Sequence, residues 1–242
     1  MTRLSVNLNK VAMLRNARPL AIPSVVKMGE ISIAAGAHGL TVHPRPDERH
    51  IRRTDVYDLA NLIKGHPAIE YNIEGNPLES PFMEIIREVR PDQCTLVPDD
   101  PTQNTSDHGW NVIKDADTLK PVIDELNALG CRVSLFMDPD IEQIKRVPEL
   151  GCDRIELYTE PYATAYRAGK GDKSFELYKA AAKCAQSVGL GVNGGHDLNL
   201  DNLPKFKEIP NLLEVSIGHA LTADALEMGY ANAVKAYLKA LA

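Results

Sequence analysis

Apolar residues fall along the chain in short runs that alternate with longer amphipathic stretches. The longer stretches repeat their apolar positions with the 3.6-residue period of a helix, as in residues 119–129 and 177–188. The short runs are predicted strands at residues 4–7, 39–43, 69–73, 94–97, 133–136, 154–157, 190–193 and 213–217. Regular alternation of strands and helices predicts a parallel sheet with helices packed outside it.

A weak internal repeat accompanies this alternation. Four of the predicted helices end in a glycine with an apolar run close behind, at Gly36, Gly130, Gly151 and Gly189. Glycine suits the left-handed position that ends a helix, and short loops join helix to strand in α/β units. A (β/α)₈ barrel usually has about 250 residues. We therefore predict an α/β protein with a single (β/α)₈ TIM-barrel domain over residues 1–242 and extra short helices.

Composition narrows the functional classes. The net charge of −6 argues against nucleic acid and anionic membranes as partners, so an anionic substrate needs a local basic pocket. No apolar run reaches the length of a membrane span, and the first residues show no signal-peptide core. The cysteines form no CxxC pair, and no GxGxxG follows the first strand. We expect a cytoplasmic protein with reduced thiols and no dinucleotide site.

Polar residues follow the predicted strands at their carboxyl ends, where barrel enzymes build their active sites. The set comprises Asn7, Asn9, Lys10, His43, Arg45, His50, Glu74, Thr105, Asp138, Glu156, His196, Ser216, Gly218 and His219. Structureless loops would not place ionisable groups at so many strand ends. We therefore expect these side chains to share one pocket.

Taken singly, most of these residues could be ordinary loop residues. Glu156 is harder to explain in that way, because Ile155 and Leu157 flank it in a predicted buried strand and a buried carboxylate needs a partner. The histidines without a strand-end position are expected to be ordinary: His38, His66 and His108.

Two kinds of anion site are predicted. Gly194-Gly195 and Gly218 follow the last two strands, where barrels commonly bind phosphate through backbone N–H groups. Basic residues form two further clusters, one of Lys10, Arg15 and Arg18 and one of Arg45, Arg49, His50, Arg52 and Arg53. Arginine binds phosphate through a bidentate fork. These centres indicate substrates that carry two phosphate groups.

The predicted pocket favours acid–base chemistry. Histidine titrates near neutrality, and burial can raise the pKa of a glutamate until it too exchanges protons. No lysine lies inside a predicted strand, so a Schiff-base lysine is not evident, and Lys10 is the nearest candidate. No serine nucleophile elbow is present either.

Ordered motifs on seven of the predicted strands resemble the pyridoxine 5′-phosphate synthase family. They include Val6-Asn7-Leu8, Leu14-Arg15-Asn16-Ala17-Arg18, Thr41-Val42-His43-Pro44-Arg45, Asn72-Ile73-Glu74, Leu96-Val97-Pro98, Val133-Ser134-Leu135-Phe136, Glu156 with Tyr162-Ala163, Val192-Asn193-Gly194-Gly195-His196 and Ile217-Gly218-His219-Ala220. The resemblance covers essentially the whole chain. It implies a cofactor-free condensation of 1-deoxy-D-xylulose 5-phosphate with 3-amino-2-oxopropyl phosphate, giving pyridoxine 5′-phosphate, phosphate and water.

The resemblance also implies roles for individual residues. His43 and Glu74 would accept protons, His196 would donate one, and Glu156 would stabilise a transition state. The aminoketone phosphate would be held by Asn7, Arg18, Gly218 and His219. The deoxyxylulose phosphate would be held by Arg45, His50 and Thr105. The resemblance also implies a homo-oligomer, an octamer built from dimers. In it, the arginine matching Arg18 reaches into a neighbouring site.

Three positions depart from the usual family pattern. The chain has Asn9-Lys10 where the family usually has Asp-His, and it has Asp197 where the family usually has glycine. Asn9 cannot act as a base, whereas Lys10 keeps a cation for phosphate. At Asp197 we expect the backbone N–H to bind substrate while the carboxylate turns away.

Two alternatives remain open. One is a metal-dependent barrel isomerase or hydrolase that uses His43, Glu74 and His196 as metal ligands. The other is a catalytically silent barrel that only binds phosphorylated metabolites. The departures at Asn9-Lys10 and Asp197 favour this second alternative, and the retained proton-transfer residues oppose it.

Overall fold

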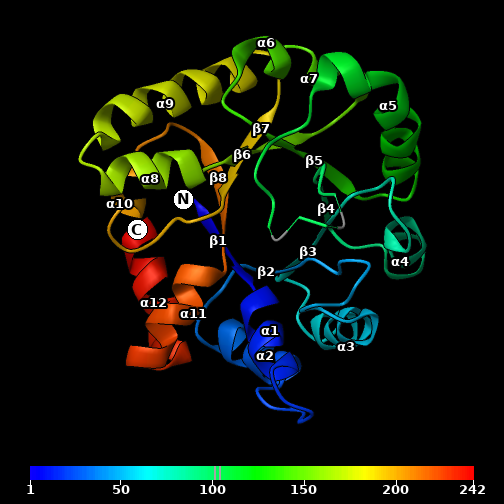
Figure 1. The fold of residues 1–242 in the computed structure, drawn as a ribbon, viewed down its shortest axis with the longest axis vertical. Coiled ribbons are helices and arrows are strands. Elements are labelled where there is room, and N and C mark those ends of the chain that lie inside the picture. The colour runs from blue at the N-terminus through cyan, green and yellow to red at the C-terminus, as the bar shows by residue number, and fades with distance from the viewer. Residues whose placement is uncertain (101, 104) are drawn as a thin grey trace.

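In the computed structural model, which describes residues 1–100, 102–103 and 105–242, eight parallel strands close into a barrel (Figure 1). They are β1 (Arg3–Asn7), β2 (Gly39–Val42), β3 (Glu70–Gly75), β4 (Gln93–Leu96), β5 (Arg132–Met137), β6 (Arg154–Tyr158), β7 (Gly191–Gly195) and β8 (Leu212–Ile217). Each strand pairs with the next, and β8 pairs with β1. The predicted barrel is confirmed, and each predicted strand overlaps an observed one.

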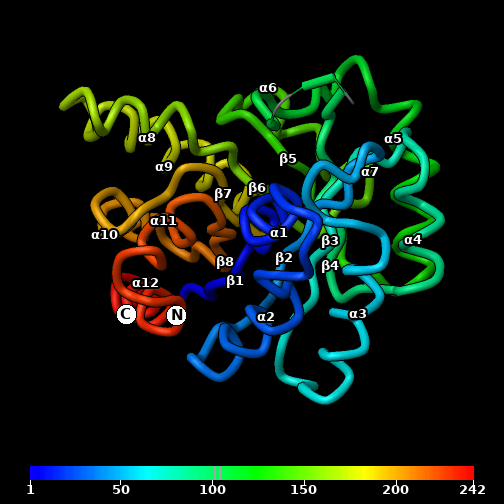
Figure 2. Tube along the Cα trace, turned by 60° about the horizontal axis from the view of Figure 1, so that its bottom comes forward, coloured from blue at the N-terminus to red at the C-terminus, as the bar shows by residue number. Residues whose placement is uncertain are grey.

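Helices surround the barrel, as Figures 1 and 2 show from two directions. They are α1 (Asn9–Asn16), α2 (Val25–Ala34), α3 (Arg53–Ile63), α4 (Phe82–Val89), α5 (Val112–Ala128), α6 (Ile141–Ile144), α7 (Val147–Leu150), α8 (Glu160–Arg167), α9 (Gly171–Ser187), α10 (Leu203–Phe206), α11 (His219–Met228) and α12 (Tyr230–Leu241). The short helices α6, α7 and α10 match the predicted extra helices. Both views place the two termini side by side, where α12 contacts β1.

The glycines of the internal repeat adopt the conformation that the sequence predicts. The φ angles of Gly36, Gly130, Gly151 and Gly189 are 104°, 83°, 85° and 88°. This left-handed region disfavours residues with a Cβ atom. Each glycine therefore allows the chain to turn from a helix into the following strand.

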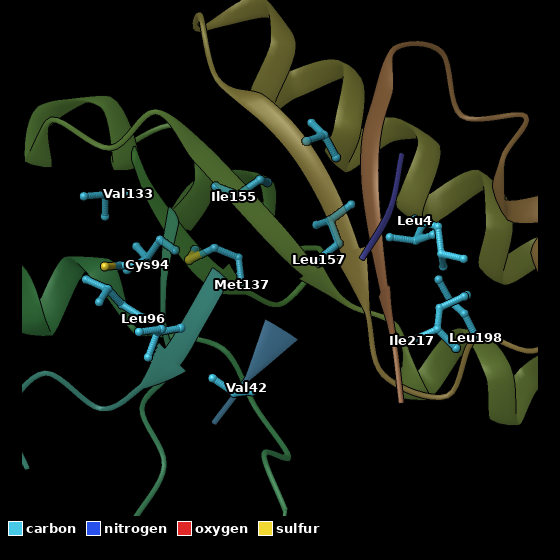
Figure 3. Packing of buried hydrophobic residues seen from close by; sticks show 14 of the residues in the cluster. Leu4, Val42, Cys94, Leu96, Val133, Met137, Ile155, Leu157, Leu198 and Ile217 are labelled. Atoms are coloured by element: carbon cyan, nitrogen blue, oxygen red, sulfur yellow. The ribbon is translucent and has the colours of Figure 1, made fainter. Parts of the chain in front are cut away.

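Apolar side chains on the outer face of the strands pack beneath the helices, and Figure 3 shows Leu4, Ile155 and Leu157 among them. Ile155 and Leu157 in β6 are fully buried. Because successive residues of a strand point to opposite faces, Glu156 between them faces the barrel interior.

The barrel interior is polar, unlike the layers of branched apolar residues that usually fill such barrels. Ser5 Oγ lies 2.6 Å from Thr41 Oγ1, and Asn72 bonds to both Thr41 and Thr95, at 3.3 and 3.0 Å. Further hydrogen bonds connect Gln93, Arg132, Arg154, Asn193 and Glu214. These side chains satisfy one another and form a polar floor below the carboxyl end of the strands.

The residues predicted to be ordinary have structural explanations. His38 Nδ1 accepts a hydrogen bond from the Leu4 N–H at 3.1 Å, whereas His66 and His108 are exposed. The cysteines are free thiols, buried or half-buried, at Cys94, Cys131, Cys152 and Cys184. None of the described helices has the length and apolar character that a membrane span requires.

Candidate active site

A cavity of about 360 Å³ opens at the carboxyl end of the strands. It is lined by Asn7, Asn9, Lys10, Met13, His43, Arg45, His50, Glu74, Thr105, Ser106, Glu156, His196, Asp197, Ser216, Gly218 and His219. The residues predicted for the site lie in this lining except Arg18 and Asp138, and the expectation that Asp138 shares this pocket is wrong because its side chain lines a separate hollow beside Trp110 and Gln143. The fold thus brings together groups from both ends of the sequence, from Asn7 to His219.

His43 is a buried imidazole directly after β2. Its backbone N–H donates to Asn9 Oδ1 at 2.9 Å, which fixes the backbone where the ring begins. The ring centroid lies 6.0 Å from that of His50. Burial lowers the pKa of His43 well below its usual range, and the nearby His50 and Arg45 lower it further. A neutral imidazole at neutral pH can accept a proton.

His50 is held as one neutral tautomer. Its Nδ1 accepts a hydrogen bond from the Ile51 N–H at 2.9 Å, so the proton of the neutral ring is on Nε2. Burial, followed by the charges of Arg45 and Lys10, lowers the pKa of His50 to about 4. His50 can therefore donate from Nε2 without carrying a charge.

Two buried carboxyl groups, those of Glu74 and Glu156, line the cavity. Burial, followed by the charge of Asp99, raises the pKa of Glu74 to about 8, and Asn7 Nδ2 donates to Glu74 Oε2 at 3.4 Å. Burial and then Glu74 raise the pKa of Glu156 well above its usual range. Within the described residues, Glu156 Oε2 has no hydrogen-bond partner. With a raised pKa, each carboxyl group keeps its proton to a higher pH than an ordinary glutamate and can donate it to a substrate oxygen.

The loop after β7 is strained and firmly anchored. The φ angles of His196 and Asp197 are 80° and 58°, in the left-handed region. Thr159 donates to the Gly195 carbonyl from its N–H at 2.8 Å and from its Oγ1 at 2.6 Å, and Asn202 Nδ2 donates to the Asp197 carbonyl at 3.1 Å. Glycine adopts this region freely, and aspartate is one of the few other residues that tolerate it. The backbone at position 197 therefore accepts either the glycine expected from the resemblance or the aspartate present here.

Two aromatic rings pack against the ring of His196, behind the cavity lining. The ring of His196 lies 5.1 Å from Phe136 and 5.5 Å from Tyr158, centroid to centroid. Burial lowers the pKa of His196 to about 4, against the opposing charge of Asp197. His196 is therefore a neutral ring in the substrate-free cavity.

Helix α11 begins at the cavity with His219, and Gly218 precedes it. A Cβ atom on Gly218 would lie 3.0 Å from Asn7 Oδ1 and 3.1 Å from Asn7 Cβ, so only glycine fits this approach without displacing Asn7. The first N–H groups of a helix have no partner within the helix and attract anions. This geometry supports the predicted phosphate site at Gly218-His219.

The guanidinium of Arg45 points its two Nη atoms toward the loop after β4 rather than into the cavity. Its Nη1 donates to Asp99 at 2.7 Å, and its Nη2 donates to the carbonyls of Asp100 and Gln103 at 2.8 and 2.9 Å. Arg45 Nε is buried and has no partner among the described residues. Arg45 can therefore offer Nε, rather than its whole fork, to an anion in the cavity.

The members of the two predicted basic clusters lie in different places and have different partners. Arg15 is buried in an ion pair with Asp55, and its Nη2 donates to the His50 carbonyl at 3.1 Å, so its role is structural. Arg53 pairs with acidic residues of α4 on the surface. Arg18 is exposed and lies outside the cavity lining.

Replacing Arg15 by methionine is expected to lower the free energy of unfolding by about 3–5 kcal/mol, because Asp55 would keep a buried charge without its partner. Urea unfolding measures this change. The matched control is Lys27→Met, which breaks an exposed ion pair with Glu30 and is expected to cost less than about 1 kcal/mol. Equal, small losses in the two variants would show that the Arg15–Asp55 pair is unimportant.

Ser216, which the sequence placed at the end of its strand, lies in the lining and hydrogen-bonds to Glu74, opposing the rise in the pKa of that carboxyl. The sequence did not single out Met13, Ser106 and Asp99. They lie in loops or on a helix face, where the two-residue period of a strand gives no signal.

His43, Glu74 and His196 share the cavity, as the metal-dependent alternative requires. Among the residues that the structure describes, however, no three His, Cys, Asp or Glu side chains gather at a spacing that could hold a metal ion.

Comparisons with known proteins identify the family of the chain. Residues 4–242 match the family model described as "Pyridoxal phosphate biosynthesis protein PdxJ". The pyridoxine 5′-phosphate synthase of Albidiferax ferrireducens is 51% identical over 247 residues, covering 100% of this chain and 98% of that protein. The pyridoxine 5′-phosphate synthase of Brucella anthropi is 52% identical over 243 residues, covering 99% of both.

More distant solved structures share the fold alone. One is described as a 4-hydroxy-2-oxoglutarate aldolase/2-deydro-3-deoxyphosphogluconate aldolase from TTHB1, with a TM-score of 0.64 and 16% identity, covering 99% of this chain and 94% of that one. Another is a thiamine phosphate pyrophosphorylase from Pyrococcus furiosus, with a TM-score of 0.59 and 13% identity, covering 99% and 95%. The family match over nearly the whole length is far more specific. The chain belongs to the PdxJ family of pyridoxal phosphate biosynthesis proteins.

Proposed function

We propose that this chain is a pyridoxine 5′-phosphate synthase, which condenses 1-deoxy-D-xylulose 5-phosphate with 3-amino-2-oxopropyl phosphate and releases phosphate and water. The observation that carries the proposal is the shared cavity of His43, Glu74 and His196, flanked by anion-binding groups. The amine of the substrate forms the imine, so the chemistry needs no lysine and no cofactor.

The proton-transfer roles follow from the state of each group. His43, neutral through burial, accepts a proton from the substrate. Glu74 accepts a second proton once it has ionised, and its pKa of about 8 makes it a base of suitable strength. His196 donates a proton, and the negative charge of a bound substrate raises its low pKa toward that role. Glu156 stabilises developing charge through its protonated carboxyl group.

The two phosphates bind on different sides of the cavity. The aminoketone phosphate lies against Asn7, Gly218 and His219, at the amino end of α11. The deoxyxylulose phosphate lies against Arg45, His50 and Thr105. Lys10, Asn9 and Asp197 complete the binding surface: Lys10 supplies a cation, Asn9 supports the backbone of His43, and Asp197 contributes its backbone N–H.

We also propose that the protein forms a homo-oligomer, an octamer built from dimers, in the cytoplasm. Arg18 supports this proposal, because it is exposed and lies outside the cavity of its own chain. In an assembly, Arg18 would reach the aminoketone phosphate of a neighbouring chain. Sedimentation analysis measures the oligomeric state, and a monomer with full activity would contradict the role of Arg18. Neither nucleic acid nor membrane is a partner in this proposal.

The value of kcat/KM, which reports the groups of the free enzyme, is expected to rise with pH through about 8. Burial raises the pKa of Glu74 from 4.5 to about 8, so the carboxylate that acts as a base forms only as pH rises through that value. In the free enzyme, His43 and His196 have lowered pKa values and stay neutral across this range. The kcat/KM measured from about pH 6 to about pH 9 tests this expectation, and a flat profile would contradict the role of Glu74.

Mixing both substrates with purified protein tests the proposed function. Formation of pyridoxine 5′-phosphate, which is detected by its absorbance, supports the proposed function. Folded protein that forms no product overturns it in favour of a silent binding barrel. The same assay after treatment with a chelator addresses the metal-dependent alternative. We expect unchanged product formation, and loss of activity that added zinc or manganese restores would favour that alternative.

A further inference from the structure

The loop after β4 is tied to the barrel mouth by one buried carboxylate, that of Asp99, which is 5% exposed. Its Oδ2 accepts hydrogen bonds from Arg45 Nη1 at 2.7 Å and from Ser106 Oγ at 2.8 Å. Its main-chain carbonyl accepts from Asn76 Nδ2 at 3.1 Å. Asp99 therefore joins the segments that follow β2, β3 and β4.

Asp99 does not line the cavity itself, but its contacts hold side chains that do. Arg45 and Ser106 both belong to the lining. The ion pair with Asp99 and the bonds to two loop carbonyls hold the guanidinium of Arg45 in one orientation. In that orientation the buried Nε has no partner among the described residues. A buried N–H without a partner is costly, and a phosphate on this side of the cavity would satisfy it.

The charge of Asp99 also reaches the proposed base. After burial, Asp99 is the largest cause of the raised pKa of Glu74. An ion pair buried to this degree has little solvent screening, so removing one partner leaves the other with an uncompensated charge. Both the anion-binding side and the base of the site therefore depend on Asp99.

We propose that Asp99 is a positioning residue for the condensation, which holds Arg45 and Ser106 against the cavity so that the deoxyxylulose phosphate meets an assembled binding surface. Asp99 acts through these partners and touches no substrate. The inference rests on the proposed function, in which Arg45 binds this phosphate and the aminoketone phosphate binds on the opposite side, at α11.

Replacing Asp99 by asparagine tests the proposal, because the amide keeps the shape and one oxygen but removes the charge that pairs with Arg45. The KM for deoxyxylulose phosphate is expected to rise by about 10-fold or more, since a charge-assisted hydrogen bond is lost. The KM for the aminoketone phosphate is expected to stay within about 2-fold. The conservative variant Asp99→Glu, which restores the carboxylate, is expected to recover at least part of the lost affinity.

The matched control is Asp117→Asn, which makes the same change at an exposed residue of α5 outside the cavity lining, and both KM values are expected to stay at the wild-type level. If Asp99→Asn does not fold, Ser106→Ala takes its place, because it removes one hydrogen bond to Asp99 and is expected to raise the same KM by a smaller factor. Unchanged KM values overturn the positioning role. An equal rise of both KM values that Asp99→Glu does not reverse would show that Asp99 is a general structural residue. That result also overturns the positioning role. Wild-type protein is assayed first, and absence of product there overturns the proposed function instead.

Discussion

Glu74→Gln is expected to lower the turnover number by about 10²–10⁴-fold, because the variant keeps the shape of the side chain but cannot take up a proton. The same variant is expected to be more stable than the wild type. The carboxyl of Glu74 has a folded-state pKa of about 8 against an ordinary 4.5, so its contribution to stability is complete only below pH 4.5 and is lost as pH rises through 8. At neutral pH, the amide removes this penalty and adds about 1–3 kcal/mol.

Single-turnover kinetics and urea unfolding measure the two effects. The matched control is Glu149→Gln on the exposed surface of α7, where turnover and stability are expected to stay near the wild-type values. Loss of activity together with loss of stability would indicate that Glu74 supports the fold rather than the chemistry. Near-normal turnover in Glu74→Gln would remove it from the mechanism.

Gly195→Ala is expected to abolish most of the activity, by about 10²-fold or more, through the carboxyl group that it displaces. A Cβ atom at Gly195 would overlap Glu156 Oε1 and lie 3.0 Å from Glu156 Cδ. Glu156 is buried but lines the cavity, so its carboxyl group is expected to yield by moving out of its wild-type place into the cavity. Initial rates with saturating substrates measure the loss.

The matched control is Gly65→Ala, where the nearest atom to an added Cβ lies 3.5 Å away, an ordinary contact. Its activity is expected to equal that of the wild type. Removing the displaced group in the double variant Gly195→Ala, Glu156→Ala separates the causes. If the double variant is no less active than Gly195→Ala, the loss comes from the displaced Glu156, whereas normal rates in Gly195→Ala alone would exclude Glu156 from the reaction.

Much of the fold follows from local pattern. The runs at residues 154–157 and 213–217 are strands because branched apolar residues alternate with residues that face inward, and Glu156 and Ser216 occupy such inward positions. The glycines that end helices have the predicted left-handed backbone. The convergence of His43, Glu74 and His196 then needs no further information, because parallel strands bring all their carboxyl ends to one face.

The partners of the charged residues could not be predicted in this way. Arg15 and Asp55 are 40 positions apart and pair only because α1 packs beside the segment that leads into α3. The fork of Arg45 meets carbonyl groups of a loop whose course has no periodic signal. The polar interior was also not predicted, because hydrogen bonds between strands such as Asn72–Thr95 depend on barrel closure and register. Local pattern predicts where a side chain lies more readily than what it contacts.

A crystal structure of the protein with deoxyxylulose phosphate and inorganic phosphate tests the central claim most directly. The account predicts two bound phosphoryl groups in the one cavity, the first beside His50 and Arg45 and the second at the N–H groups of Gly218-His219. His43, Glu74 and His196 would then lie between them, within reach of the sugar carbons. Phosphoryl groups bound on separate faces of the barrel, or a sugar chain directed away from these three residues, would contradict it.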